Sequence, residues 1–150
     1  MNVKDVDRLG YGDCKALTNY MRTLLKAAGI KSYYCRIKDD RSVQKYDENF
    51  PKMFGNHVIL MVPTEKGNIW LENTSQEIAF NHLNYTSLDR NVMAISENEI
   101  KLINTPTYKP EESSEILNAE VKLNPDNSIN VDAKFRFSGA QYDFQMPLTS

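Results

Sequence analysis

Apolar residues recur at helical spacing near the start of the chain. Between residues 14 and 28 they fall three and four positions apart, which places them in one stripe on a helix: Leu17, Tyr20, Met21, Leu24, Leu25 and Ala28. Asp13 stands where an N-cap is expected, and Gly29 follows as a stop signal. The pattern predicts a helix over about residues 14–28, with Cys14 at its first helical position.

Shorter apolar runs after this helix predict strands. Residues 32–37 are rich in tyrosine, and residues 58–62 form a continuous apolar run of the kind that is buried on both faces. A turn at residues 64–67 and the apolar residues 68–72 complete a hairpin with that second run. We therefore expect an antiparallel sheet built around this hairpin.

The connections between these strands differ in character. Residues 38–56 are polar and irregular, and a connection of that length is more often functional or mobile than idle. Residues 81–90 are ambiguous, whereas residues 92–95 and 100–103 predict two more short strands. The first part of the chain, residues 1–104, is therefore expected to form one α+β core.

The amino-acid composition changes after residue 104. Residues 105–113 are rich in proline and polar residues and predict a linker. Residues 114–150 alternate apolar and polar positions on both sides of a turn at 125–128, which predicts a β-hairpin-rich segment. A lone hairpin is only marginally stable in water. This segment must therefore pack on the core, pair edge to edge with another copy, or represent a partial or shortened β-sandwich-like domain.

Composition and charge narrow the class of protein. The chain of 150 residues is 41% hydrophobic and 25% charged, which is globular composition, and its net charge of −2 gives no field that would attract nucleic acid. No stretch approaches the roughly 20 apolar residues that a bilayer crossing needs, and the charged first residues do not resemble a signal peptide. We expect neither nucleic-acid binding nor membrane insertion. The compartment stays open, because an export signal would lie upstream if the chain is a fragment.

Cys14 is the candidate nucleophile. The thiolate is the reactive form of cysteine, and a helix N-terminus favours its negative charge and offers backbone N–H groups for an oxyanion. The alternative is an inert cysteine, since Cys14 continues the apolar stripe and buried cysteines are common. Cys35 is expected in the core, although a Cys14–Cys35 disulfide is conceivable. The cysteines and histidines lack paired-ligand spacing, so no metal is expected.

His57 and Glu72 lie at the open end of the predicted hairpin. Folding about the turn at residues 64–67 brings them within a residue or two of each other, and the register decides whether they share a face. A carboxylate there would fix the imidazole tautomer and stabilise the imidazolium. The alternative is a surface histidine beside a solvated glutamate. Together with Cys14, the pair has the residue types that nucleophilic thiol catalysis requires.

Three motifs resemble the transglutaminase-like family, whose fold belongs to the papain-like thiol superfamily. The runs YGDCK and LLKAAGI, at residues 11–15 and 24–30, are similar to its nucleophile helix, and NHVILMVP at residues 56–63 is similar to its histidine strand. IWLENTS at residues 69–75 resembles its acid strand. The resemblance covers about residues 9–74 and is greatest to members found in large bacterial multidomain proteins. It implies a nucleophile helix packed on an antiparallel sheet, with Cys14, His57 and Glu72 as catalytic residues.

The resemblance also implies a function. It indicates a cysteine acyl-transfer enzyme acting on amide or peptide bonds, with peptidase- or amidase-like hydrolysis favoured over cross-linking, a peptide or protein substrate, and no cofactor. A non-catalytic scaffold or peptide-binding module with the same fold is the alternative. The resemblance to bacterial multidomain proteins implies that this protein is exported if the chain is a fragment.

Some positions depart from the family pattern. Glu72 stands where the family has aspartate, and Asn73 replaces its proline, so that the Asn73 amide becomes a candidate contact of His57. Only thirteen residues precede Cys14, so the family's upstream helices and its upstream oxyanion side chain are not expected. Asp13, Asn73 and Trp70 are candidate binding residues, although Trp70 is more typical of packing.

Overall fold

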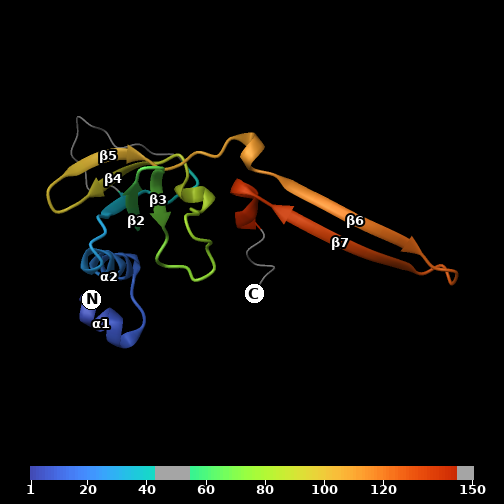
Figure 1. The fold of residues 1–150 in the computed structure, drawn as a ribbon, viewed down its shortest axis with the longest axis horizontal. Helices are drawn as coiled ribbons and strands as arrows, with labels where there is room; N and C mark the ends of the chain where they lie inside the picture. The colour runs from blue at the N-terminus through green and yellow to red at the C-terminus, as the bar shows by residue number, and fades with distance from the viewer. Residues whose placement is uncertain (43–54, 145–150) are drawn as a thin grey trace. The chain divides into compact units, whose positions relative to one another are not determined.

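The computed structural model describes residues 1–42 and 55–144 and divides the chain into two compact units, Met1–Thr107 and Tyr108–Ser150. The boundary falls inside the predicted linker. The first unit has an α+β architecture, as expected (Figure 1). Its elements are α1 (Val3–Leu9), α2 (Cys14–Ala27), β1 (Tyr33–Ile37), β2 (His57–Thr64), β3 (Gly67–Leu71), the 3-10 turn η1 (Tyr85–Ser87), β4 (Asn91–Ile95) and β5 (Ile100–Asn104).

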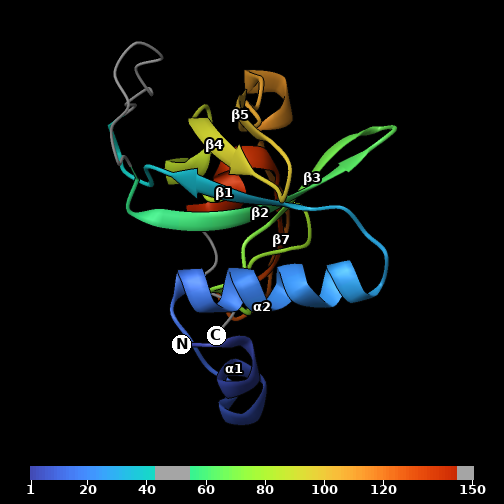
Figure 2. The same ribbon diagram turned by 90° about the vertical axis from the view of Figure 1, so that its left-hand side faces the viewer.

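The five strands form one antiparallel sheet in the order β3-β2-β1-β4-β5. Burial alternates along β1 and β4, so one face of these strands lies in the core. Val58–Met61 of β2 are buried without alternation, which confirms the expectation that this run is covered on both faces. Helix α2 packs on β2 and β1 (Figure 2). Residues 43–54 of the long polar connection lie outside the described residues.

Helix α2 begins and ends where the sequence predicts, but it contacts the sheet differently. Asp13 accepts a hydrogen bond of 2.8 Å from the backbone N–H of Ala16, and Gly29 takes a left-handed conformation with φ +77° after the last turn. The buried residues of the helix are Ala16 and Thr18, whereas Leu24 of the predicted stripe is 47% exposed. The small residues of the first two turns allow that end of α2 to approach β2 closely.

Helix α1 corrects the expectation that no helix precedes α2. Asn2 caps it by accepting a 2.9 Å hydrogen bond from the N–H of Asp5, and Gly10 ends it with φ +70°. The only buried side chain of α1 is Val6, and α1 packs on α2. A single buried position in seven residues gives too weak a periodic signal, although both caps are visible in the sequence.

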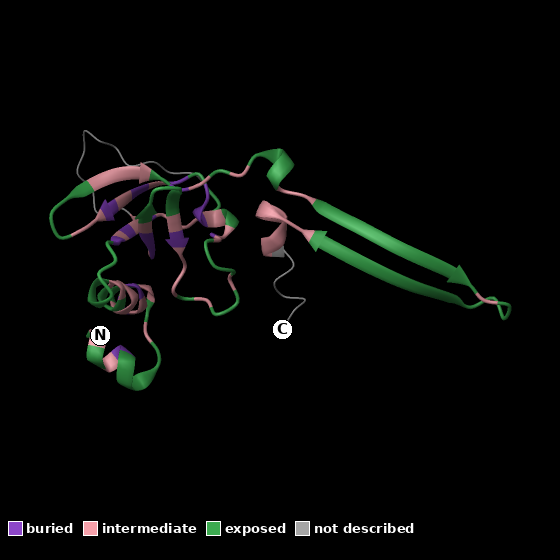
Figure 3. Cartoon of the chain, in the orientation of Figure 1, coloured by how far each residue is buried: buried purple, intermediate pink, exposed green. Residues whose placement is uncertain are grey.

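The second unit contains a long two-stranded ribbon. Strands β6 (Glu115–Leu123) and β7 (Ile129–Phe137) pair antiparallel along their full nine residues, and the short 3-10 segments η2 (Pro110–Glu112) and η3 (Gly139–Phe144) flank them. Nearly all strand residues are exposed (Figure 3). Within the described residues of this unit no third strand accompanies the pair, so the unit is a ribbon there rather than a sandwich.

Candidate active site

Cys14 is the first residue of α2, as predicted from the Asp13 cap. Its side chain is partly exposed, and it is a free thiol, as is Cys35. Because the Asp13 carboxylate takes the N–H of Ala16, the N–H groups of Cys14 and Lys15 stay without an acceptor inside the helix. The site therefore combines a partly exposed thiol with N–H groups that have no acceptor within the helix.

Cys35 differs from Cys14 in its burial. Its side chain is fully buried in β1, and burial raises the pKa of the Cys35 thiol to about 12 despite the nearby charge of Lys101. The expectation that Cys35 belongs to the core is confirmed.

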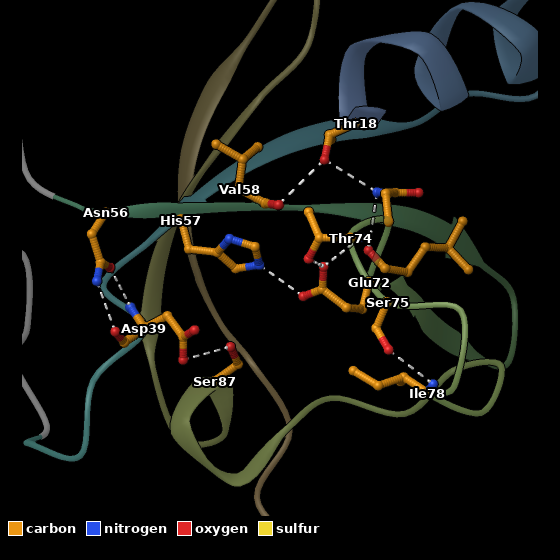
Figure 4. A network of polar contacts seen from close by, with 12 residues as sticks. Thr18, Asp39, Asn56, His57, Val58, Glu72, Thr74, Ser75, Ile78 and Ser87 are labelled. Atoms are coloured by element: carbon orange, nitrogen blue, oxygen red, sulfur yellow. Dashed lines mark hydrogen bonds and ion pairs between the residues drawn. The ribbon is translucent and has the colours of Figure 1, made fainter. Parts of the chain in front are cut away.

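The hairpin of β2 and β3 brings His57 and Glu72 together. Thr64 pairs with Gly67 and Leu60 with Leu71, and continuing this register places Glu72 opposite Ile59, two residues from His57 and on the same face. His57 Nε2 donates a hydrogen bond of 2.7 Å to Glu72 Oε2 (Figure 4). The side chains are only 15% and 5% exposed. The surface alternative for this pair is therefore wrong.

The charge of His57 is stabilised by its neighbours. Burial alone lowers the pKa of His57, but the hydrogen bond and negative charge of Glu72 outweigh it, and a hydrogen bond with the Cys14 side chain and the charge of Asp39 add to the rise. The pKa of His57 reaches about 9, so the imidazolium persists at neutral pH. Because Nε2 is engaged by Glu72, Nδ1 is the remaining ring nitrogen of His57.

Glu72 is itself held in place. Its Oε1 accepts hydrogen bonds from both the backbone N–H, at 2.9 Å, and the hydroxyl of Thr74, while Oε2 faces His57. Burial raises the pKa of Glu72, but the hydrogen bonds of His57 and Thr74 outweigh it and lower the pKa overall. Glu72 is therefore a fixed, ionised partner, even though its side chain is one methylene longer than aspartate.

Asn73 does not contact His57 through its amide nitrogen, contrary to the expectation from its position. Asn73 Nδ2 instead donates to Thr18 Oγ1 at 3.2 Å and to the carbonyl of Leu71 at 3.3 Å. Thr18 Oγ1 in turn donates to the carbonyl of Val58 at 3.2 Å (Figure 4). A single buried hydroxyl thus ties α2 to β2 and to Asn73 in the segment that follows β3. No local pattern predicts this role of Thr18, because Thr18 lies outside the predicted apolar stripe and its partners are distant in the sequence.

The other candidate binding residues have structural contacts. Trp70 is 2% exposed and lies in the core, which fits packing. Asp13 is largely exposed and pairs with Lys15 at 3.6 Å as well as capping the helix. His82 lies in the connection between β3 and η1, as expected for a loop histidine.

Two hydrogen bonds between Asn56 and Asp39, close to the end of β1, were not predicted from the sequence. Asn56 Oδ1 accepts from the N–H of Asp39 at 2.8 Å, and Asn56 Nδ2 donates to the carbonyl of Asp39 at 2.9 Å. Ser87 donates to the Asp39 carboxylate at 3.3 Å (Figure 4). These hydrogen bonds hold Asn56 in place, and Asn56 is the residue immediately before His57, where β2 begins. The paired contacts join residues 17 positions apart, which no local pattern reveals.

Among residues 1–42 and 55–144, no three His, Cys, Asp or Glu side chains lie close enough to hold a metal ion. No helix in those ranges is long and apolar enough to cross a membrane. Comparisons with protein-family models, curated proteins and solved structures find no match.

Proposed function

We propose that the protein is a cysteine-dependent acyl-transfer enzyme of the transglutaminase-like kind, within the papain-like thiol superfamily. The observation that carries the proposal is the His57 ring, which Glu72 holds at Nε2 by a 2.7 Å hydrogen bond and whose pKa the neighbouring Cys14 side chain helps to raise. These are the nucleophile, the base and the orienting acid of a catalytic triad. The three motif resemblances support the same assignment.

The first half-reaction transfers an acyl group to the enzyme. The Cys14 thiolate attacks the carbonyl carbon of an amide and forms a C–S bond, while the carbonyl oxygen takes the negative charge. The N–H groups of Cys14 and Lys15 are suitably placed on α2 to stabilise that oxyanion. When the intermediate collapses, the C–N bond breaks and the His57 imidazolium protonates the leaving amine.

The second half-reaction releases the acyl group. Neutral His57 removes a proton from water, the resulting hydroxide attacks the thioester carbon, and the C–S bond breaks to give a carboxylic acid and the Cys14 thiolate beside the His57 imidazolium. An amine in place of water would give cross-linking. We favour hydrolysis of peptide-like bonds because the motifs resemble bacterial members of the family most.

Turnover of peptide amides and thioesters tests the proposal. Cys14→Ala should abolish turnover, and His57→Gln should lower kcat/KM by roughly 10²- to 10⁴-fold, the usual contribution of general acid–base catalysis. Cys35→Ser is the matched control, because the buried Cys35 takes no part in the reaction. If none of these substrates is turned over while Cys14 remains no more reactive than a free thiol, the alternative of a non-catalytic peptide-binding scaffold is to be preferred.

We propose a second role, self-association, for the ribbon of β6 and β7. One face of the ribbon is apolar from the Leu117–Phe135 pair to the Leu123–Ile129 pair. Its large residues are each more than half exposed: Leu117, Val121, Leu123, Ile129, Val131 and Phe135. The outer edge of β7 is paired with no other strand among the described residues, and such an edge next to an apolar face favours pairing with another chain.

The occupant we propose for that edge is β7 of a second copy. Antiparallel pairing centred on Ala133 would place Asp132 opposite Lys134 of the second copy, twice over, and Val131 opposite Phe135. Within the ribbon Asp132 already faces Glu120, a like-charge pair that the incoming lysine would relieve. The resulting four-stranded sheet would have one continuous apolar face.

A further inference from the structure

A small hollow opens beside the proposed catalytic groups. Its volume is about 140 Å³, and the residues around it include Lys15, Tyr34, Arg36, Asn56 and His57. Lys15 directly follows the nucleophile, and His57 is the proposed base, so a group bound in the hollow would lie next to the carbonyl that Cys14 attacks. The volume corresponds to several water molecules at roughly 30 Å³ each, which is enough for a short polar side chain.

The chemistry of the hollow is cationic. Lys15 and Arg36 contribute positive charge, and none of the described residues that line the hollow carries a carboxylate. The charge of His57 is balanced by its ion pair with Glu72. Asp13 pairs with Lys15 at 3.6 Å but does not line the hollow. Arg36 Nη2 donates to the Gly55 carbonyl at 3.3 Å, so the guanidinium would attract a carboxylate mainly through its charge.

Tyr34 adds a neutral donor to this wall. Burial raises the pKa of Tyr34, and the negative charge of Cys14 raises it further. The hydroxyl therefore remains protonated at neutral pH and can donate a hydrogen bond to an anion. The influence of Cys14 also shows that Tyr34 lies within electrostatic reach of the nucleophile.

We propose that this hollow is a substrate subsite for a carboxylate, and that the enzyme acts on peptides with an acidic side chain next to the attacked amide bond. The inference rests on the proposed function and specifies its substrate class. Lys15 and Arg36 supply the charge, and the Tyr34 hydroxyl supplies a further donor.

Two alkylating agents test the subsite without requiring turnover. Iodoacetate and iodoacetamide have the same leaving group and similar size but differ in charge. In the Cys35→Ser protein, the ratio of the iodoacetate to the iodoacetamide rate at Cys14 should exceed that of glutathione by about three- to tenfold, as expected for a partly screened ion pair. Raising the salt concentration to 0.5 M should reduce this ratio, because salt screens the attraction.

Variants assign the effect to the hollow rather than to His57. Arg36→Gln and Lys15→Gln should each lower the ratio, and together they should bring it close to the value set by His57 alone. Arg36→Lys should retain most of it. Lys66→Gln, at the exposed turn between β2 and β3, is the matched control and should leave the ratio unchanged. Among the described residues Lys15 forms its ion pair with Asp13, and both side chains are largely exposed, so the Lys15 variant keeps the test valid if Arg36→Gln does not fold.

The outcomes separate the two proposals. A reactive Cys14 that depends on His57, with a ratio unaffected by Arg36 and Lys15, would overturn the subsite and leave the enzyme. A Cys14 no faster than glutathione with either agent would overturn the enzyme itself. Once turnover is established, peptide amides that carry glutamate before the scissile bond should have a higher kcat/KM than their glutamine analogues. Comparing substrates with a blocked and a free terminal carboxylate then shows whether the hollow binds a side-chain or a terminal carboxylate. Equal kcat/KM for the two analogues would contradict the proposal.

Discussion

Glu72 reaches His57 diagonally across the hairpin, over an offset of two residues, and accepts a 2.7 Å hydrogen bond from Nε2. The extra methylene of glutamate, compared with aspartate, is suited to this offset. The second oxygen of Glu72 is anchored by Thr74, so the longer side chain is not a looser one. The relationship between these two residues sets both the charge and the orientation of the imidazole.

Glu72→Gln should change how stability depends on pH. The pKa of His57 is raised from 6.5 to about 9 in the folded protein, so its stabilising contribution is complete below pH 6.5 and is lost as the pH rises through about 9. Removing the carboxylate removes the main cause of the rise. The free energy of unfolding, measured in urea between pH 6 and pH 9, should therefore fall less steeply in the variant than in the unaltered protein.

His82→Gln is the control for that experiment. His82 is the second of the two histidines in the chain, and the variant should retain the slope between pH 6.5 and 9 because it leaves the Glu72–His57 pair intact. Identical slopes for Glu72→Gln and the unaltered protein would show that His57 is not held charged by Glu72.

The two cysteines should differ sharply toward iodoacetamide. At pH 6.5 Cys14 should be alkylated at least about tenfold faster than Cys35, because the first is partly exposed beside an imidazolium whereas burial raises the pKa of the second to about 12. Peptide mass spectrometry after timed quenching measures both rates in one sample. His57→Ala should slow Cys14 and leave Cys35 unchanged; equally slow labelling of both cysteines would remove the basis for an activated thiol.

Thr18→Val should destabilise the core although the side chains have nearly the same shape. The substitution leaves the Val58 carbonyl and the Asn73 amide without their shared hydroxyl, at a cost of about 1–3 kcal/mol in the free energy of unfolding. Thr23→Val lies on the same helix, loses only a bond to the Asn19 carbonyl at an exposed position, and should change stability by no more than about 0.5 kcal/mol. Equal effects of the two variants in urea denaturation would contradict the role given to Thr18.

Self-association through β7 should respond to a charge swap. Asp132→Lys would oppose two lysines across the proposed interface, and Lys134→Asp would oppose two aspartates, so each single variant should weaken dimerisation. The double variant restores opposite charges and should recover it. Because Asp132→Lys also removes the like-charge pair with Glu120, loss of the dimer in that variant cannot be attributed to a damaged ribbon. Sedimentation velocity over a range of concentrations measures the effect; a monomer at every concentration would refute the pairing.

Much of the fold follows from local patterns. The Asp13 cap fixes the start of α2, and the Thr64–Gly67 turn fixes a register in which His57 and Glu72 share a face, so both could be predicted. The contacts that sequence reasoning missed are long-range and polar. Thr18 meets Val58 across 40 residues, and Asn56 brackets Asp39 across 17, and neither has a periodic or capping signature. The exposure of Leu24 was missed for a related reason, since apolar spacing defines a face but not the element that covers it.

Because Thr18 links α2 to β2, the reactivity of the Cys14 thiol can report whether α2 is packed on the sheet. Cys14 lies one turn before Thr18, so any opening that detaches the start of α2 from β2 also carries the sulfur away from the imidazole. Alkylation kinetics would then register separation of helix and sheet well before global unfolding. Because of this coupling, loss of the buried Thr18 hydroxyl is expected to change the reactivity of Cys14 as well as the stability of the fold.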